Sequence, residues 1–349
     1  MSCKREPLRF GLVGTGRIAE SYARAFEGYA EARVAAVADV RPEAAAALAR
    51  TLGCPSFDSH TALYGAGRLD AVLVCSPPAT HTAISRYFLR RGIHVLCEKP
   101  LSVDARGAHL MMHAARLSGA LLTMASKFRY VEDVVRARYL VASGVIGTIV
   151  QAENCFTSRV DMAARWNSDP AISGGGVLID NGTHSVDLMR LFLGPLVDVQ
   201  AVEGLRSQGL AVEESARLFV RNAAGALGSI DLSWSLAKDT DTYLALYGTE
   251  GTLEVGWKKS RYRRTGDPGW TSFGTGYDKV QAFRGQIDNF VRAIRGEEEL
   301  RTTLEDALAS VKVVEAAYRA LQASRWTAVA ADAILRRPRF LSLVAEHRA

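Results

Sequence analysis

Short apolar runs alternate with helical stretches through the first third of the sequence, and this alternation constrains the fold more than any other feature. The runs have the unbroken apolar character of buried β-strands, and the segments between them are Ala-rich. They cover residues 8–13, 34–37, 71–75, 93–98 and 121–125. Strands that alternate with helices predict a parallel, right-handed, doubly wound sheet. We therefore expect an N-terminal α/β domain over residues 1–126.

A glycine turn follows the first of these strands. Gly14 permits a tight turn that other residues resist, and Gly16 lets the backbone approach a ligand closely. The helix that follows begins with unpaired N–H groups and the positive end of its dipole, which together favour a phosphate. Strand, glycine turn and helix in this order are typical of a Rossmann domain that binds a dinucleotide. The predicted ligands in this turn are Gly14, Gly16, Arg17 and Ile18.

An aspartate follows the second predicted strand, where such domains place a ribose ligand. Asp39 lies roughly 20 residues beyond the glycines, and a carboxylate there binds the adenosine ribose. The carboxylate would repel a 2′-phosphate and so favours NAD, although Arg41 offsets part of that preference and leaves NADP possible. The alternative is that Asp39 only caps the helix beginning near Pro42.

The turn after the third strand supplies a second group of candidate cofactor ligands. Prolines hold this turn, and Thr80 is placed to cap the helix that follows. His81 either reaches the cofactor or belongs only to the first turn of that helix. We include Ser76, Pro77 and His81 among the predicted cofactor-binding residues.

The fourth strand ends abruptly on two opposite charges and a proline, Glu98, Lys99 and Pro100. Ligands of open parallel sheets bind just beyond the carboxyl ends of the strands, so these two charged side chains are expected to face a small molecule. Proline prevents the strand from continuing and fixes how the chain leaves the sheet. The alternative is an ordinary solvated strand end.

Residues 127–325 have a different pattern, in which strand-like runs follow one another with few helices between them. This spacing predicts a second, α+β domain with an open, mostly antiparallel sheet. The predicted strands cover residues 147–158, 197–204, 212–220, 226–234, 243–247 and 252–257. We expect the basic segment 258–264 to be an exposed loop rather than an anion site, and two closing helices over 281–294 and 304–321. A basic tail, residues 326–349, completes the chain.

Three consecutive glycines in the second part of the chain precede an apolar run and a polar group. Asp180 and His184 would lie one turn apart if the helix begins near Asn181. A carboxylate and an imidazole so placed can form an acid/base pair, because histidine titrates near neutral pH. The alternative makes Asp180 or Asn181 a helix cap and His184 a packed helix residue.

Composition excludes several other classes of protein. The net charge of +6 comes from scattered Lys and Arg, so we expect no nucleic-acid partner. The five cysteines are odd in number and lack C-x-x-C spacing, which argues against a disulfide framework or a zinc site and fits a reducing cytoplasm. We expect no metal, no signal peptide and no membrane span.

The glycine turn, Glu98-Lys99-Pro100, the glycine triplet and Asp180-x-x-x-His184 together resemble the Gfo/Idh/MocA oxidoreductase family over about residues 8–321. The resemblance implies a nicotinamide cofactor on the first domain and a sugar or cyclitol against the second. It implies that Lys99 contacts the substrate hydroxyl, that Asp180 binds the sugar and that His184 is the general acid/base. It also implies that the Lys99–Pro100 peptide is cis.

The expected function is therefore NAD(P)-dependent hydride transfer to or from a secondary hydroxyl of a sugar, nucleotide-sugar or cyclitol. Two alternatives stay open, an NAD-dependent glycoside hydrolase that transiently oxidises C3 and a non-catalytic cofactor-sensing regulator. Glu98 and Lys99 are also predicted cofactor-binding residues. The predicted substrate-binding residues are Lys127, Arg129, Arg165, Trp166 and Asn181. We expect a homodimer or homotetramer.

Overall fold

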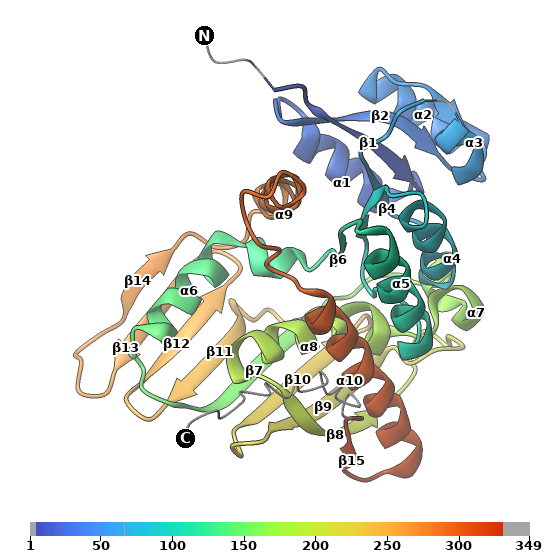
Figure 1. Cartoon of the computed structure of the whole chain (residues 1–349). Coiled ribbons are helices and arrows are strands. Elements are labelled where there is room, and N and C mark those ends of the chain that lie inside the picture. Colours follow the sequence, from blue (N-terminus) through green and yellow to red (C-terminus); the bar gives the residue numbers. More distant parts are fainter. Residues whose placement is uncertain (1–4, 66, 331–349) are drawn as a thin grey trace, which may run out of the picture.

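The computed structural model describes residues 5–65 and 67–330. Its N-terminal part is a six-stranded parallel sheet in the order β3-β2-β1-β4-β5-β6, which confirms the predicted Rossmann-type sheet (Figure 1). The strands are β1 (Leu8–Val13), β2 (Ala32–Ala38), β3 (Ser56–Phe57), β4 (Ala71–Val74), β5 (His94–Cys97) and β6 (Leu122–Met124). The helices between them are α1 (Arg17–Phe26), α2 (Pro42–Leu52), α3 (His60–Gly65), α4 (Pro78–Leu89) and α5 (Ala105–Ser118).

The order of the strands creates the place where a ligand can bind. β1 lies between β2 and β4, so the chain runs outward from β1 in both directions along the sheet. A crevice opens beyond the carboxyl ends of the strands at such a reversal. All four residues of β4 are fully buried, which explains why the strand reads as an unbroken apolar run.

The second part of the chain forms a nine-stranded sheet in the order β14-β13-β12-β11-β7-β10-β9-β8-β15. Neighbouring strands are antiparallel except β7 and β10, which confirms the expected mostly antiparallel sheet. The strands are β7 (Ile149–Thr157), β8 (Leu196–Glu203), β9 (Ser215–Asn222), β10 (Leu227–Ser233), β11 (Thr242–Gly248), β12 (Gly251–Gly256), β13 (Ser260–Arg264), β14 (Thr271–Gly274) and β15 (Thr327–Ala328).

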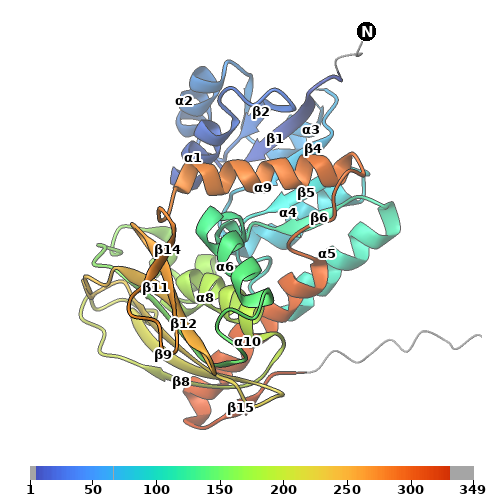
Figure 2. The ribbon, with the colours of Figure 1, turned by 90° about the vertical axis from the view of Figure 1, so that its left-hand side faces the viewer.

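Among residues 5–65 and 67–330, helices cover one face of this sheet and none covers the other face (Figure 2). The elements are η1 (Lys127–Tyr130), α6 (Glu132–Ala142), η2 (Trp166–Ser168), α7 (Pro170–Ser173), α8 (Val177–Leu193), α9 (Lys279–Ile294) and α10 (Leu304–Ala323). α8 packs on β7, β9 and β10, whereas α10 packs on β8 and reaches α5 of the first sheet. The two sheets are thus joined through a shared layer of helices.

The prediction of a loop over residues 258–264 was wrong, because most of this segment is strand β13, but four of its basic residues are exposed as expected, Lys258, Lys259, Arg263 and Arg264. Its charges are compatible with a strand because neighbours neutralise or cover them. Arg261 donates from Nε to Glu254 on β12 at 2.7 Å, and its guanidinium lies 4.2 Å from the centroid of the Trp270 ring.

Helix α9 crosses back to the first sheet although its sequence lies in the predicted second domain. Its Phe283 ring lies 4.4 Å from that of Tyr22 on α1, and Phe290 packs edge-on to Phe10 at 6.1 Å. The core beneath β1 and β2 is therefore closed by a segment more than 250 residues away in the sequence, between Phe10 and Phe290. The predicted start of the tail also lies inside the fold, because β15 pairs with β8.

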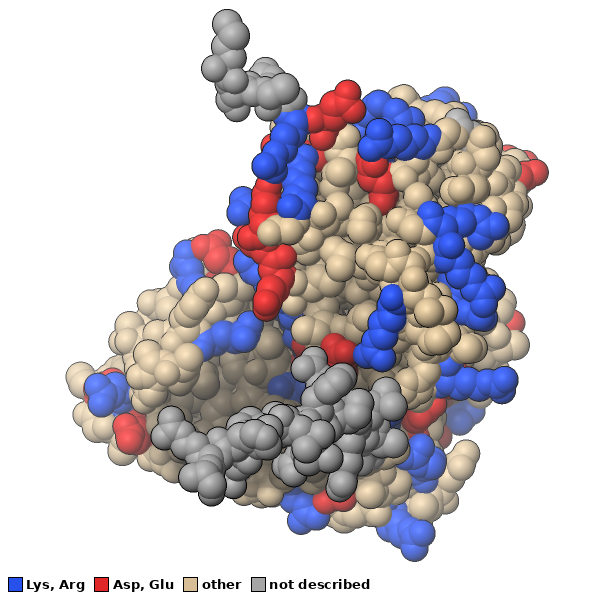
Figure 3. Space-filling view, viewed as in Figure 1, with Lys and Arg blue, Asp and Glu red and all other residues tan. Residues whose placement is uncertain are grey.

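No helix within residues 5–65 and 67–330 is long and apolar enough to cross a membrane. Lys and Arg side chains on the face of the molecule in Figure 3 stand in small groups interspersed with Asp and Glu, and they form no continuous basic surface among the described residues there. Most of the predicted tail, residues 331–349, lies outside the described part of the chain.

Candidate active site

The two positions in the first turn, 14 and 16, are occupied by glycine for different structural reasons. Gly14 has a φ of +94°, and a Cβ there would lie 2.5 Å from the backbone nitrogen of Ser76, so packing alone requires glycine. A Cβ on Gly16 would meet no atom within 4 Å. Gly16 also precedes α1 without a side-chain cap, which leaves the start of the helix open to an anion. The open space at Gly16 therefore fits a dinucleotide phosphate.

Asp39 holds the glycine turn from the end of β2. Its carboxylate accepts hydrogen bonds from the backbone and hydroxyl of Thr15 at 2.8 and 3.0 Å and from the backbone of Arg41 at 2.9 Å. Burial alone would raise the pKa of Asp39, but the hydrogen bonds from Arg41 and Thr15 outweigh it and lower the pKa. Arg41 lines the pocket beside the turn. Asp39 is thus a fixed anion at the predicted ribose position.

The turn after β4 differs from two of the predictions. α4 begins at Pro78, so Thr80 lies inside the first turn and donates its hydroxyl to the carbonyl of Pro77 instead of capping the helix. His81 is fully buried, and both ring nitrogens lie 2.8 Å from backbone carbonyls, those of Pro100 and Ser76. The side chain of His81 therefore cannot contact a cofactor, and it instead ties together two turns that border the pocket.

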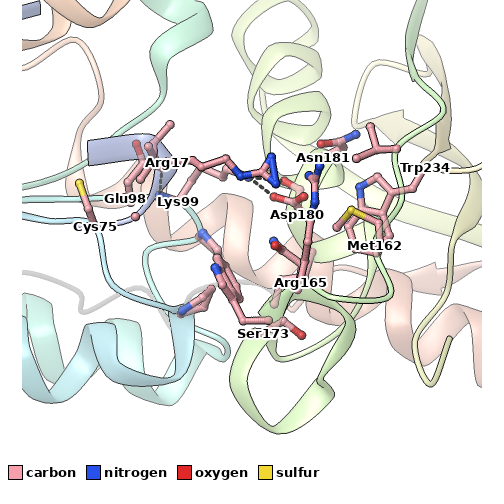
Figure 4. A pocket seen from close by; sticks show the side chains of 18 of the residues that line it. Arg17, Cys75, Glu98, Lys99, Met162, Arg165, Ser173, Asp180, Asn181 and Trp234 are labelled. Carbon is pink, nitrogen blue, oxygen red and sulfur yellow. Dashed lines mark hydrogen bonds and ion pairs between the residues drawn. The ribbon is translucent and has the colours of Figure 1, made fainter. Parts of the chain in front are cut away.

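Glu98 and Lys99 face in different directions at the end of β5. Glu98 is buried and accepts hydrogen bonds from the Tyr22 hydroxyl at 2.7 Å and from the backbone of Lys99 at 3.1 Å, while burial raises the pKa of its carboxyl. Lys99 reaches across the pocket to Asp180, donating to its carboxylate and, at 3.1 Å, to its carbonyl (Figure 4). The Lys99–Pro100 peptide is cis, as the family resemblance implied.

Helix α8 brings Asp180 and His184 to this lysine. The helix begins at Val177, so the prediction that it begins near Asn181 was wrong, and the apolar run is its first turn. Asp180 and His184 nevertheless lie one turn apart, and the His184 ring packs edge-on to Phe128 at 5.1 Å. Burial, then the charges of Lys99 and Lys127, lower the pKa of His184 well below its ordinary value. His184 is therefore a neutral imidazole at neutral pH.

The glycine triplet before α8 allows a close approach within the protein. A Cβ on Gly175 would lie 1.9 Å from the Tyr318 hydroxyl, and one on Gly176 would lie 2.1 Å from the carbonyl of Glu213. The buried carboxylate of Glu213 accepts from the backbone of Gly176 at 2.9 Å, from Leu178 at 3.1 Å and from the Tyr318 hydroxyl at 2.8 Å. This carboxylate binds the N-terminus of the helix that carries Asp180 and His184.

The predicted substrate-binding residues divide into two groups. Arg165, Trp166 and Asn181 line the pocket, whereas Lys127 is half-buried and is not among the lining residues. The assignment of Arg129 was wrong, because its buried guanidinium is bidentate to Asp187 and also donates to Asp306 at 2.9 Å. That network fixes η1 to α8 and α10, and it leaves no donor of Arg129 directed at the pocket.

The glycine turn at Gly16, Lys99 and Asp180 border one cavity of about 560 Å³. It runs from the glycine turn and Ser76 on the first sheet to the loop after β7 and the start of α8 on the second (Figure 4). Within the described residues, no group of three or more His, Cys, Asp or Glu could hold a metal ion. The pocket thus combines an open anion-binding turn with a lysine and a carboxylate, while the neutral His184 is buried one helical turn beyond that carboxylate and is not among the lining residues.

Comparison with known proteins identifies both halves of the chain. Residues 8–126 match the oxidoreductase family with an NAD-binding Rossmann fold, and residues 134–254 match the GFO/IDH/MocA C-terminal domain. The protein belongs to the Gfo/Idh/MocA oxidoreductase family. It is accordingly an NAD(P)-dependent enzyme that acts on a CH–OH group.

Relatives in the Gfo/Idh/MocA family span almost the whole chain. Inositol 2-dehydrogenase of Rhizobium meliloti (strain 1021) is 29% identical and covers 93% of this chain and 99% of its own. D-xylose 1-dehydrogenase (NADP(+)) 2 of Haloferax volcanii is 28% identical, covering 90% and 98%. A structure of levoglucosan dehydrogenase with NADH and levoglucosan superimposes with a TM-score of 0.86 at 21% identity, covering 93% and 99%. The similarity to levoglucosan dehydrogenase shows the fold alone.

Sequence reasoning missed several residues that the structure brings to the site. Met162, Trp234 and Lys279 line the cavity from three segments that are far apart in the sequence. Gln286 on α9 donates at 2.8 Å to the Tyr22 hydroxyl, which in turn contacts Glu98. Only the packing of α9 against α1 places Gln286 and Lys279 here, and no local motif signals that packing.

Proposed function

We propose that the protein transfers hydride between NAD and a secondary hydroxyl of a sugar, nucleotide-sugar or cyclitol. The observation that carries this proposal is the cavity that joins the turn at Gly16 to Lys99 and Asp180, with His184 one helical turn beyond Asp180 on α8. The relatives named for inositol and D-xylose support the same substrate class.

The residues of the site divide the proton chemistry between them. A nicotinamide dinucleotide, when bound, supplies the hydride acceptor or donor. His184 is the base that takes the hydroxyl proton, because its imidazole is held neutral. Lys99 is the cation that stabilises the developing alkoxide. Asp180, already in contact with Lys99, orients the lysine and a substrate hydroxyl.

The cofactor would be held mainly by the first sheet. The start of α1 at Gly16 and Arg17 suits the diphosphate, and Asp39 with Arg41 suits the adenosine ribose. The fixed carboxylate of Asp39 favours NAD over NADP. Arg17 and Arg165 both line the cavity, and burial together with the positive charge of Arg17 lowers the pKa of Arg165, so we assign both to the same anionic group.

The experiment that tests this function follows the absorbance of NADH at neutral and mildly alkaline pH. The purified full chain is mixed with NAD and a panel of sugars, nucleotide-sugars and cyclitols, while mass spectrometry identifies any cofactor released on denaturation. We expect NADH formation with at least one substrate and its loss in His184→Ala. An absence of both nicotinamide turnover and bound cofactor would overturn the proposal.

The second sheet suits self-association, and we propose a homodimer or homotetramer that uses its helix-free face. Phe219 on β9 and Leu227 on β10 are each 47% exposed there. Arg217 and Arg221 on the same face pair with Asp231 and Asp198, so its charges are largely neutralised within the chain. Light scattering should give an even multiple of the chain mass, and Phe219→Glu should lower it.

A further inference from the structure

Two lysines near the catalytic groups form no ion pair with any acidic residue in the described part of the chain. Lys279 lines the cavity, whereas Lys127 is half-buried and not among the lining residues, although the charges of Lys99 and Lys279 act on it. The Nζ atom of Lys127 lies 5.2 Å from the ring centroid of Phe128, 5.6 Å from that of Tyr277 and 5.7 Å from that of Phe283. The Nζ of Lys279 lies 6.0 Å from the same Phe283 centroid. Two ammonium groups therefore approach one aromatic ring.

The acids near these lysines are already engaged. Asp180 is paired with Lys99, and both oxygens of Glu98 accept hydrogen bonds, from Tyr22 and from the backbone of Lys99. Within the described residues, neither Lys127 nor Lys279 forms an ion pair or a side-chain hydrogen bond. Burial, then the charge of Lys99, lowers the pKa of Lys127 to about 8, and the charges of Glu98 and Asp180 offset only part of this effect.

A bound cofactor would not supply the missing negative charge on this side of the pocket. Its phosphates suit the turn at Gly16 and Arg17, which belongs to the first sheet. Its oxidised nicotinamide ring is itself a cation. The region around Lys127 and Lys279, at the edge of the cavity where Lys279 lines it, therefore keeps an excess of positive charge that the second reactant can neutralise.

We propose that the substrate carries an anionic group, a carboxylate or a phosphate, that binds between Lys127 and Lys279 while its reacting hydroxyl lies at Lys99 and His184. The proposal rests on the function proposed above and narrows its substrate class to acidic sugars or cyclitols. The Phe283 ring lies beside both ammonium groups and the Tyr277 ring beside that of Lys127, and this apolar wall strengthens an ion pair formed there by reducing contact with water.

Calorimetric titration of the NADH-loaded protein tests this inference without requiring turnover. The probes are glucose, glucuronate and glucose 6-phosphate, which share a ring and differ in charge. We expect at least one anionic probe to bind at least tenfold more tightly than glucose, and a preference between the two anions distinguishes a carboxylate site from a phosphate site. Equal or tighter binding of glucose would overturn the proposal.

Matched variants test whether Lys127 and Lys279 bind the anionic group of the probe. Lys127→Met and Lys279→Met keep the length of the side chain and remove its charge, so each should weaken binding of the preferred anion by about tenfold and leave glucose unchanged. The control is Lys259→Met, because Lys259 is exposed and lies outside the cavity. An equal loss for glucose, or no loss in either variant, contradicts the proposal. NADH formation on neutral sugars without charge preference would reject this inference and leave the dehydrogenase function standing.

Discussion

Glu213→Ala should both destabilise the protein and slow its reaction, because this carboxylate holds the start of α8. The substitution leaves three donors without their acceptor, the backbone N–H groups of Gly176 and Leu178 and the hydroxyl of Tyr318. Each net hydrogen bond contributes about 1 kcal/mol, so the expected loss of unfolding free energy is about 3 kcal/mol. The site is 5% exposed, so water cannot easily replace the lost acceptor.

Thermal unfolding converts this loss into a measurable shift. An unfolding entropy of about 2.1 cal/mol/K per residue over 349 residues makes 3 kcal/mol equal to a fall in Tm of about 4 °C. Tyr318→Phe removes one of the three donors together with its bond, and we expect a fall of about 1 °C. Differential scanning calorimetry on the two variants and the parent protein checks both values.

Steady-state kinetics separates local positioning from general weakening. Asp180 and His184 lie in the first two turns of α8, so a loosened N-terminus should lower kcat while the dissociation constant for NADH, measured by fluorescence, stays within twofold. Tyr318→Phe should show a smaller fall in kcat. A Tm within 1 °C of the parent, or a normal kcat in Glu213→Ala, would refute the reasoning.

Three further predictions concern the glycine turn, the buried ion pairs and His184. Gly14→Ala should lower the Tm, because its Cβ would lie 2.5 Å from the backbone nitrogen of Ser76. Gly16→Ala should leave the Tm unchanged and weaken NADH binding at least tenfold in a fluorescence titration. Arg129→Met should cost about 3–5 kcal/mol in urea unfolding by leaving buried Asp187 uncompensated; a loss below 1 kcal/mol would contradict this. In the unfolded chain His184 binds a proton near pH 6.5, whereas the folded chain keeps the imidazole neutral at that pH. The free energy of unfolding should therefore fall as the pH drops below 6.5, by up to about 1.4 kcal/mol per pH unit. His184→Gln should reduce this dependence of the unfolding free energy on pH.

The sequence was sufficient for the first sheet because its signals are local. Alternating strands and helices, the glycines at 14 and 16 and the charges at the end of β5 each report a nearby backbone requirement. The strands β7 to β12 were likewise visible as short apolar runs. β13 was not, because its arginines are acceptable in a strand only through partners such as Glu254 and Trp270.

The remaining errors concern contacts between distant segments. Nothing near Lys279 indicates that α9 returns to pack on α1, and nothing near His81 shows that both its nitrogens meet backbone carbonyls. The glycine triplet approaches Glu213 closely, and nothing near the triplet indicates this partner, because Glu213 lies more than 35 residues further along the chain. Arg129 was assigned to the site because a sequence does not show whether an arginine forms a buried ion pair or contacts a ligand.

The most direct test of the account is to follow the transferred hydrogen itself. The protein is incubated with NAD and a sugar or cyclitol substrate that carries deuterium on its ring carbons, and the mass of the nicotinamide product is measured. The account predicts NADH that is heavier by one deuterium, and no such product from Lys99→Met or His184→Ala. NADH without deuterium, or equal labelling in those two variants, would contradict hydride transfer at the site formed by Lys99, Asp180 and His184.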